Sequence, residues 1–276
     1  MATDNKMRCT AYFLLGLILL LTFFPLWFML VTSFKSVFQF YHNFWWPSWP
    51  LYLSNYLRVF KVIYPYILNS IFTTIASVIG IVFLGALSGF VFARFWFPAK
   101  RLLYYAIIGL MMLPWILTLV PAFMVVKKLG MINTFWVLIL PYIASGQVLS
   151  FYMFHNFFCS LPEELFESAR LDGAGVFQQF YHIGAALSRP LIGLVAIVSS
   201  LSVWNNFIWP LVTTSDERLT VLTVGVMRFN VAYTSGAIDY GQLFAGYTLA
   251  ALPLLVLFLF ATRQFMAGLT AGALKE

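Results

Sequence analysis

Six long stretches of this 276-residue chain contain no lysine, arginine, aspartate or glutamate. Each is long enough for a helix to cross the roughly 30 Å hydrocarbon core of a bilayer. Unpaired backbone groups are costly in lipid, and the stretches do not alternate as barrel strands do, so helices are expected. With 62% hydrophobic and 9% charged residues, the chain differs from an ordinary soluble domain. We predict an all-α integral membrane protein, a single domain over residues 1–276, with six transmembrane helices at about 11–33, 66–93, 102–126, 134–158, 190–213 and 243–264.

The net charge of +7 comes from basic residues scattered singly at the ends of these stretches, where they can meet water and lipid headgroups. It indicates contact with membrane lipid and not with nucleic acid. Six spans place both termini on one side of the membrane, and nine of the sixteen basic residues then lie on that side. Because basic residues favour the cytoplasmic side, we expect both termini in the cytoplasm. The first stretch is too long for a signal peptide and lacks a small-residue cleavage site, so we interpret it as a retained anchor.

The predicted outer segment 35–65 is dense in aromatic residues and contains the run FQFYHNFWWPSWPLY. Its tryptophans Trp45, Trp46 and Trp49 are typical of an aromatic belt at the membrane interface. The alternative is that their rings stack on a sugar. Two prolines within the run argue against a continuous helix there.

Small residues recur at four-residue spacing in the second predicted span, as Ala76 with Gly80 and as Gly85 with Gly89. Small residues let helices approach closely in lipid, so this face is expected to pack against another helix. A substrate path is the alternative.

Prolines interrupt three other spans, and because proline removes a helical hydrogen bond, kinks are expected at these positions. The residues are Pro114, Pro121, Pro141 and Pro253. Kinked helices border the pathway in many transporters, but proline is also simply frequent in membrane helices. Both interpretations stay open at this point.

The interiors of the predicted spans hold no charged side chain, which argues against ion or proton coupling and for an uncharged cargo. Hydroxyls, amides and aromatic faces suit a polyhydroxylated molecule, although the same groups also join helices to one another. The candidate residues of a substrate pathway are Trp115, Tyr142, Gln147, Asn205, Asn206, Trp209 and Tyr247.

No arrangement typical of an enzyme stands out in the sequence. The three histidines are far apart and lack neighbouring metal ligands, and the two cysteines fit neither a zinc site nor a disulfide framework. The chain also lacks the G-x-x-x-x-G-K-S/T loop, so it is not expected to bind ATP in that manner. We predict a protein that is not an enzyme, with no cofactor and no metal of its own.

Four of the nine acidic residues fall between Glu163 and Asp172, in a polar island between apolar stretches. Ser160 followed three residues later by Glu163 predicts a capping box that starts a helix. Asp172 followed by Gly173 predicts its end, because glycine readily takes the left-handed conformation.

A second short helix can follow through Phe177 and Tyr181. Leu165 and Phe166 are expected to form an exposed apolar face on the first helix, which a partner protein would cover. The sequence thus predicts two short helices outside the bilayer, held at both ends by membrane spans.

This segment, ELFESARLDGAGVFQQF, resembles the EAA loop of binding-protein-dependent ABC transporter permeases, whose pattern is E-A-A-x-x-D-G-A followed by an aromatic residue. The matching residues are Glu167, Ala169, Asp172, Gly173 and Ala174. Further runs, ILNSIFTT, FARFWFPAKRLL, LVPAFMVVKKLGMINTFWVLILPY, WNNFIWPLV and GLTAGALK, resemble the carbohydrate-type subfamily in the same order. The likeness extends over nearly the whole chain and is greatest to the second, six-span permease of maltose-type importers.

The resemblance implies a coupling-helix loop at residues 160–186, between the fourth and fifth spans, that docks into a cytoplasmic ATPase subunit. The residues implied in coupling are Glu164, Glu167, Ala169, Asp172, Gly173 and Ala174. It also implies a second permease, two ATPase subunits that bind ATP and Mg, and an extracytoplasmic solute-binding protein. The segment 216–242 would reach toward that binding protein, and the tail 268–276 toward the ATPase. The expected location is the cytoplasmic membrane of a bacterium or archaeon, and the expected cargo a sugar, oligosaccharide or polyol.

Two rival functions are a self-contained channel or secondary carrier, and a membrane-embedded enzyme. The uncharged spans and the acidic loop argue against the carrier, and the lack of clustered catalytic acids argues against the enzyme.

Overall fold

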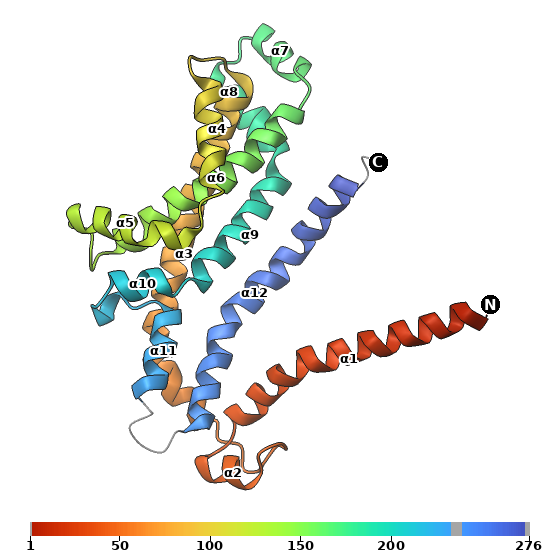
Figure 1. Ribbon diagram of the computed structural model, residues 1–276, viewed down its shortest axis with the longest axis vertical. Helices are drawn as coiled ribbons and strands as arrows, with labels where there is room; N and C mark the ends of the chain where they lie inside the picture. The colour runs from red at the N-terminus through yellow and green to blue at the C-terminus, as the bar shows by residue number, and fades with distance from the viewer. Residues whose placement is uncertain (1, 233–238, 274–276) are drawn as a thin grey trace. The chain divides into compact units, whose positions relative to one another are not determined.

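The computed structural model describes residues 2–232 and 239–273, and every regular element in these ranges is helical (Figure 1). The elements are α1 (Ala2–Ser33), α2 (Val37–His42), α3 (Ser54–Arg94), α4 (Lys100–Leu110), α5 (Trp115–Lys128), α6 (Phe135–Ser160), α7 (Glu164–Leu171), α8 (Val176–Gln179), η1 (Phe180–Ala185), α9 (Arg189–Asn205), α10 (Ile208–Thr213), η2 (Glu217–Leu219), α11 (Leu222–Ala232) and α12 (Tyr240–Ala273). The predicted all-α class is confirmed.

The chain divides into two compact units. Unit 1 consists of Met1–Pro65 and Gly225–Pro253, and unit 2 of Tyr66–Val224 and Leu254–Glu276. The prediction of one permease domain over the whole chain is not tested by this division and stays a prediction.

Unit 1 is organised around a buried lysine. Lys35 has no exposed surface, and its ammonium donates to the backbone oxygens of Asn43 at 2.7 Å and Phe44 at 2.8 Å. Burial lowers the pKa of this ammonium. Asn55 donates to the carbonyls of Ser33 at 3.0 Å and Lys35 at 2.9 Å, which ties the start of α3 to the end of α1.

The tryptophan-rich segment of unit 1 packs partly on α1. Trp45 lies 5.9 Å from the rings of both Phe24 and Phe28, whereas Trp49 remains 80% exposed. The helix α3 begins at Ser54. The predicted loop 35–65 is therefore helical over its last third as well as in α2.

In unit 2, α3 and α6 approach each other through glycines, as the small-residue spacing predicts. A Cβ atom added at Gly85 would collide with the side chain of Ser150 on α6, and one at Gly80 with Ile143. Ser150 donates from its hydroxyl to the carbonyl of Ile81 at 3.1 Å, so the close approach also permits a hydrogen bond between the helices.

The predicted third span is broken into two helices. The pair α4 and α5 bends by 106° at the turn between Leu110 and Trp115. The three amides that follow α4, at residues 111–113, bond to carbonyls three residues back, which tightens the chain, and Pro114 then offers no N–H to continue the helix. The break lies at Pro114, one of the prolines at which a kink was expected, and the prediction that residues 102–126 form one span stays a prediction.

The predicted fifth span is broken as well, between α9 and α10. Pro210 cannot donate to the carbonyl of Asn206, and the hydroxyl of Thr223 donates to that oxygen instead, at 3.1 Å. The helix therefore ends at Asn205 and restarts at Ile208.

Among the described residues, three helices are long and apolar enough to cross a membrane: α1 over Thr10–Ser33, α3 and α6. Two bent helix pairs could each count as one further span, which would raise the number to five. They are α4 with α5, and the segment Val176–Ala185 with α9. A shorter apolar helix covers Tyr240–Val256. Six spans remain a prediction.

Two predicted contact segments lie partly outside the described residues. The segment 216–242 contains η2 and α11 where a loop was expected, and residues 233–238 of it fall outside the described part. The tail 268–276 continues α12 as far as Ala273, and residues 274–276 are likewise outside.

The α3–α6 contact predicts a difference between two glycine substitutions. In Gly89→Ala, the new Cβ would lie 2.7 Å from Cβ of Phe154 and 2.8 Å from the backbone nitrogen of His155, so a helix must shift. We expect a loss of about 1–3 kcal/mol, seen as a lower unfolding temperature in detergent. The control Gly109→Ala meets nothing within 4 Å and should leave that temperature unchanged or raise it slightly. Equal unfolding temperatures of the two variants would contradict the packing argument.

Candidate functional site

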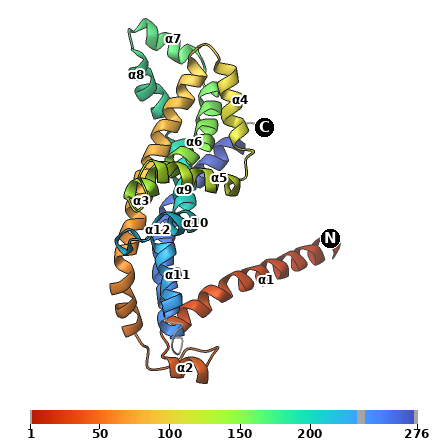
Figure 2. The same ribbon diagram turned by 60° about the vertical axis from the view of Figure 1, so that its left-hand side comes forward.

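The acidic helix α7 ends as its sequence predicts. The amide of Gly173 bonds to the carbonyl of Arg170 at 3.0 Å, and that of Ala174 to Ala169 at 2.9 Å. This is a Schellman motif, which requires a left-handed residue, and Gly173 has φ of +82°. The motif turns the chain sharply from α7 toward α8 (Figures 1 and 2).

The start of α7 differs from the prediction. Ser160 is the last residue of α6, and its hydroxyl donates to the carbonyl of Phe157 at 2.8 Å, inside that helix. The residue that precedes α7 is Glu163, whose side chain makes no capping bond. The predicted capping box is therefore wrong, because α6 continues through Ser160 and the carboxylate of Glu163 is engaged by arginines.

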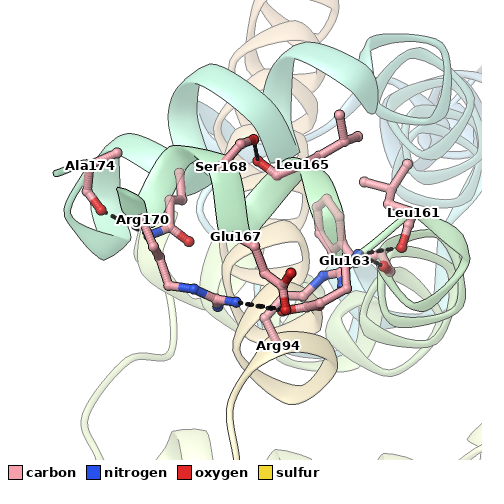
Figure 3. A network of polar contacts seen from close by, with 10 residues as sticks. Arg94, Leu161, Glu163, Leu165, Glu167, Ser168, Arg170 and Ala174 are labelled. Atoms are coloured by element: carbon pink, nitrogen blue, oxygen red, sulfur yellow. Dashed lines mark hydrogen bonds and ion pairs between the residues drawn. The ribbon is translucent and has the colours of Figure 1, made fainter. Parts of the chain in front are cut away.

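Arg94, the last residue of α3, joins three helices (Figure 3). Its guanidinium donates to the carbonyls of Phe158 at 2.6 Å and Leu161 at 2.8 Å, at the end of α6, where the Phe158 oxygen also accepts from the amide of Leu161 at 3.3 Å. The same guanidinium forms an ion pair with Glu163, at the entrance of α7. The side chain of Arg94 is only 9% exposed, so these contacts lie largely out of water.

The buried side chain of Phe166 fixes α7 to α3. Its exposed fraction is 1%, its ring lies 5.9 Å from that of Phe90 on α3, and the guanidinium carbon of Arg94 lies 4.1 Å above it. The prediction that Leu165 and Phe166 together form an open apolar face is wrong for Phe166. The eight-residue helix α7 lies against the ends of α3 and α6, so one of its sides is covered. Phe166 is on this covered side.

A second arginine completes the network around Glu163. Arg170, in the last turn of α7, donates to the other carboxylate oxygen of Glu163 at 3.0 Å. This bond, with the bond from Arg94, holds the pKa of the Glu163 carboxyl below its ordinary value, although partial burial opposes the shift. A lowered pKa in the folded state means that the pairing stabilises the fold above the unfolded pKa, and that this stability is lost as pH falls through the folded pKa. The side chain of Glu163 is half-exposed, so solvent screens the effect.

The residues implied in coupling divide into an outer and an inner group. Glu164, Glu167, Asp172 and Gly173 are exposed, whereas Ala169 and Ala174 are partly buried. The carbonyl of Ala174 also accepts a 2.8 Å bond from the buried amide of Gln179, which fastens α8 to the turn. Their role in coupling is not tested by these positions and stays a prediction.

The sequence pattern predicts no structural role for Arg94, and for Glu163 it predicts a capping-box role with Ser160 and not a partner in another helix. The one available signal was the position of the two residues: Arg94 ends the second predicted span, and Glu163 follows the end of the fourth. Orientation by charge explains such a basic residue equally well, so the pair could not be identified from the sequence alone.

A cavity of about 510 Å³ lies in unit 2 between α5, α6, α9 and α10. Its lining residues are Ile81, Trp115, Thr118, Leu119, Ala122, Pro141, Tyr142, Ser145, Gly146, Leu149, Ser150, Met153, Val195, Val198, Ser199, Ser202, Val203, Asn206 and Trp209. Four of the seven predicted pathway residues are among them: Trp115, Tyr142, Asn206 and Trp209.

The other three predicted pathway residues lie elsewhere. Gln147 donates to the carbonyls of Gly80 at 3.4 Å and Ile81 at 3.3 Å, so it joins α6 to α3. Asn205 donates to the carbonyl of Leu201 at 2.9 Å within α9. Tyr247 belongs to unit 1, where its ring lies 6.1 Å from that of Phe244.

The Arg94 network predicts how firmly α7 is held. In Arg94→Ala, two bonds to carbonyls and an ion pair are lost, and hydrogen bonds to charged groups are worth about 1.5–3 kcal/mol each. We expect hydrogen exchange at the amides of α7 to accelerate at least about tenfold in the purified protein, while α9 is unaffected. The matched control Glu164→Gln changes an exposed acid at the same helix start and should leave exchange unchanged. Unaltered exchange in Arg94→Ala would mean that other contacts hold the helix.

Residues 82–270 match the family described as binding-protein-dependent transport system inner membrane component. The diacetylchitobiose uptake system permease protein NgcG of Streptomyces coelicolor is 31% identical, over 99% of this chain and 91% of that protein. The arabinooligosaccharides transport system permease protein AraQ of Halalkalibacterium halodurans is 29% identical, over 91% of each chain.

A solved structure has the same fold. It is the crystal structure of a bacterial ABC transporter involved in the import of the acidic polysaccharide alginate, which superposes with a TM-score of 0.81 over 95% of this chain and 98% of that one, at 18% identity. The resemblance of the segment ELFESARLDGAGVFQQF to the EAA loop is confirmed at the level of the family: the chain belongs to the binding-protein-dependent transport system inner membrane components.

Proposed function

We propose that this chain is a permease subunit of an ATP-driven, binding-protein-dependent importer of a sugar, oligosaccharide or polyol. It forms half of the translocation pore, and a second permease forms the other half. The proposal is supported by the family match and by relatives whose names refer to the uptake of diacetylchitobiose and arabinooligosaccharides. The chain is not an enzyme, and ATP and Mg belong to two partner ATPase subunits.

Six membrane spans serve this function in the proposal. They are α1, α3, the bent pair α4 and α5, α6, α9 with α10, and α12. Three of them, α1, α3 and α6, have the length and composition of a span without any break. Six spans put both termini in the cytoplasm, together with the loop between α6 and α9. The protein then lies in a bacterial or archaeal cytoplasmic membrane.

The coupling role is supported by the position of α7, which is packed against the protein on one side and exposed on the other. Phe166 and the Arg94 network fix the inner side of α7. The outer side presents Glu167, whose side chain is 62% exposed, and Leu171, which is 89% exposed. An exposed leucine beside acidic groups fits a docking surface that a partner covers, and the partner proposed here is the ATPase subunit.

A rigid helix transmits force better than a mobile one. Because α7 is fixed to the ends of α3 and α6, a movement of the ATPase subunit against α7 would turn these helices as one body. In the importer, closure of the ATPase pair around ATP would in this way open the pore toward the binding protein.

Two substitutions in α7 are expected to separate ATP hydrolysis from uptake. Gly173→Val forces a branched residue into φ of +82°, and Glu167→Lys reverses an exposed charge. Each should lower sugar uptake at least about tenfold, with the chain still in the membrane and ATP hydrolysis by the complex retained. The control Gly173→Asn tolerates the left-handed conformation and should keep most of the uptake. Normal uptake in both Gly173→Val and Glu167→Lys would rule out coupling through α7.

Purification with partners tests the proposed class directly. The tagged chain is extracted from its native membranes in mild detergent, with and without crosslinking, and co-purifying proteins are identified. An ATPase subunit, a second permease and a solute-binding protein are expected. A chain that is isolated alone under all these conditions, and that takes up solute after ATP depletion, would be a carrier instead.

A further inference from the structure

We propose that the cavity of unit 2 is a binding site for a short, neutral saccharide, so that this subunit contacts the cargo itself. The inference rests on the proposed importer function and adds to it both a site and a substrate class. Its volume of about 510 Å³ falls within the 300–1,000 Å³ or so that is usual for small-molecule sites.

A row of polar groups on α9 and directly after it lines the cavity. Ser199 and Ser202 of α9 and Asn206 at its C-cap, here called the α9 polar stripe, recur at three- and four-residue spacing. The hydroxyls of Ser199 and Ser202 make no hydrogen bond to any described residue, whereas Ser200, between them, donates to the carbonyl of Ala196 at 2.7 Å. Asn206 uses its side-chain oxygen to accept from the amide of Trp209 at 3.2 Å, and its NH₂ group remains available. The stripe therefore offers donors and acceptors to a ligand.

The opposite walls supply acceptors. Thr118 on α5 donates its hydroxyl hydrogen to the carbonyl of Trp115 at 2.7 Å, and Ser150 on α6 donates to that of Ile81 at 3.1 Å. Their oxygens keep lone pairs for another donor. A saccharide hydroxyl both donates and accepts, so it matches a cavity in which the two kinds of group alternate.

Aromatic surface accompanies these polar groups. The indole N–H of Trp209 is fixed by a 2.8 Å bond to the carbonyl of Val137, which holds the ring in the cavity wall. Trp115 lines the other side and is 55% exposed. Flat apolar rings pack against the C–H faces of a sugar ring, a contact that an ion or a fully hydrated solute does not make.

Tyr142 provides an independent sign of a ligand. It lines the cavity with only 9% of its surface exposed, and its buried hydroxyl has no hydrogen-bond partner among the described residues. An unpaired buried hydroxyl is costly, and in native structures such groups commonly have a functional reason. A saccharide hydroxyl that reached it would remove that cost.

The class of ligand follows from charge. Every residue that lines the cavity is neutral at pH 7. A carboxylate or phosphate would lose its hydration in this apolar surrounding without a counter-ion, whereas a neutral hydroxyl needs only hydrogen bonds. The geometry thus favours neutral saccharides over uronates and sugar phosphates. A helix of the second permease is the competing occupant, because such polar groups also join membrane helices, and a site filled by a helix would show no protection by sugar.

The test is protection of a cysteine in the complete importer. The chain without its native cysteines (Cys9→Ser, Cys159→Ser) carries Ser202→Cys and is assembled with its partners in lipid nanodiscs. A small methanethiosulfonate reagent labels the cysteine with and without diacetylchitobiose, maltose or arabinobiose, and with glycerol 3-phosphate or an alginate trisaccharide. We expect the neutral sugar that stimulates ATP hydrolysis by the complex to slow labelling at least fivefold, and the charged compounds to have no effect. Leu201→Cys, one residue away on α9 and outside the cavity lining, is the control and should show no protection.

A second variant distinguishes binding from folding. Tyr142→Phe removes only the unpaired hydroxyl, so it should not lower the unfolding temperature, but it should raise the KM for uptake about five- to tenfold at unchanged membrane level. Three outcomes would overturn the proposed site: no sugar slows the labelling of Ser202→Cys, the cysteine is not labelled at all in the complex, or only the charged compounds protect it. In each of these cases ATP-dependent uptake by the same complex would leave the proposed function intact, whereas absence of ATP-dependent uptake would refute that function itself.

Discussion

The guanidinium of Arg94 is the contact on which the α7 end of unit 2 depends. Three groups converge on it: the carbonyls of Phe158 and Leu161 at the end of α6, and the carboxylate of Glu163, which precedes α7. The end of a helix leaves carbonyls without partners, and an arginine can satisfy several of them at once because its donors spread in a plane. Phe90 of α3 adds an apolar link between the last turn of α6 and the first turn of α7, because its ring lies 5.5 Å from that of Phe158 and 5.9 Å from that of Phe166. Phe166 then packs beneath the same guanidinium.

Rigidity at that end connects with rigidity farther along the helices. The glycines of α3 bring its backbone so close to α6 that a Cβ atom at Gly85 or Gly89 would collide with α6. Close packing of this kind resists movement of one helix past the other. In the proposed coupling, a displacement applied to α7 would reach the cavity beside α6 as a movement of whole helices. This is the physical content of the proposed coupling.

The sequence predicted those features that depend on local chemistry or on composition. The helical class follows from the cost of unpaired backbone groups in lipid, the α3–α6 contact from small residues at four-residue spacing, and the end of α7 from Gly173. Features that depend on distant partners were missed. Phe166 looked exposed because a short polar helix gives no sign of what lies beneath it, and Ser160 looked like a cap because the sequence does not show where α6 ends.

The broken fifth span shows most clearly why a pathway could be predicted only in part. A proline at position 210 frees the carbonyl of Asn206, and Thr223, a residue far along the chain, accounts for that oxygen. The sequence predicted one span over 190–213 and pathway candidates at Asn205 and Asn206, but it indicated neither Pro210 as a break nor Thr223 as the partner. The break leaves Asn206 just before α10, where its side-chain oxygen accepts from the amide of Trp209, and Asn206 also lines the cavity. One residue thus serves both the backbone at the break and the proposed saccharide site, whereas its neighbour Asn205 bonds within α9.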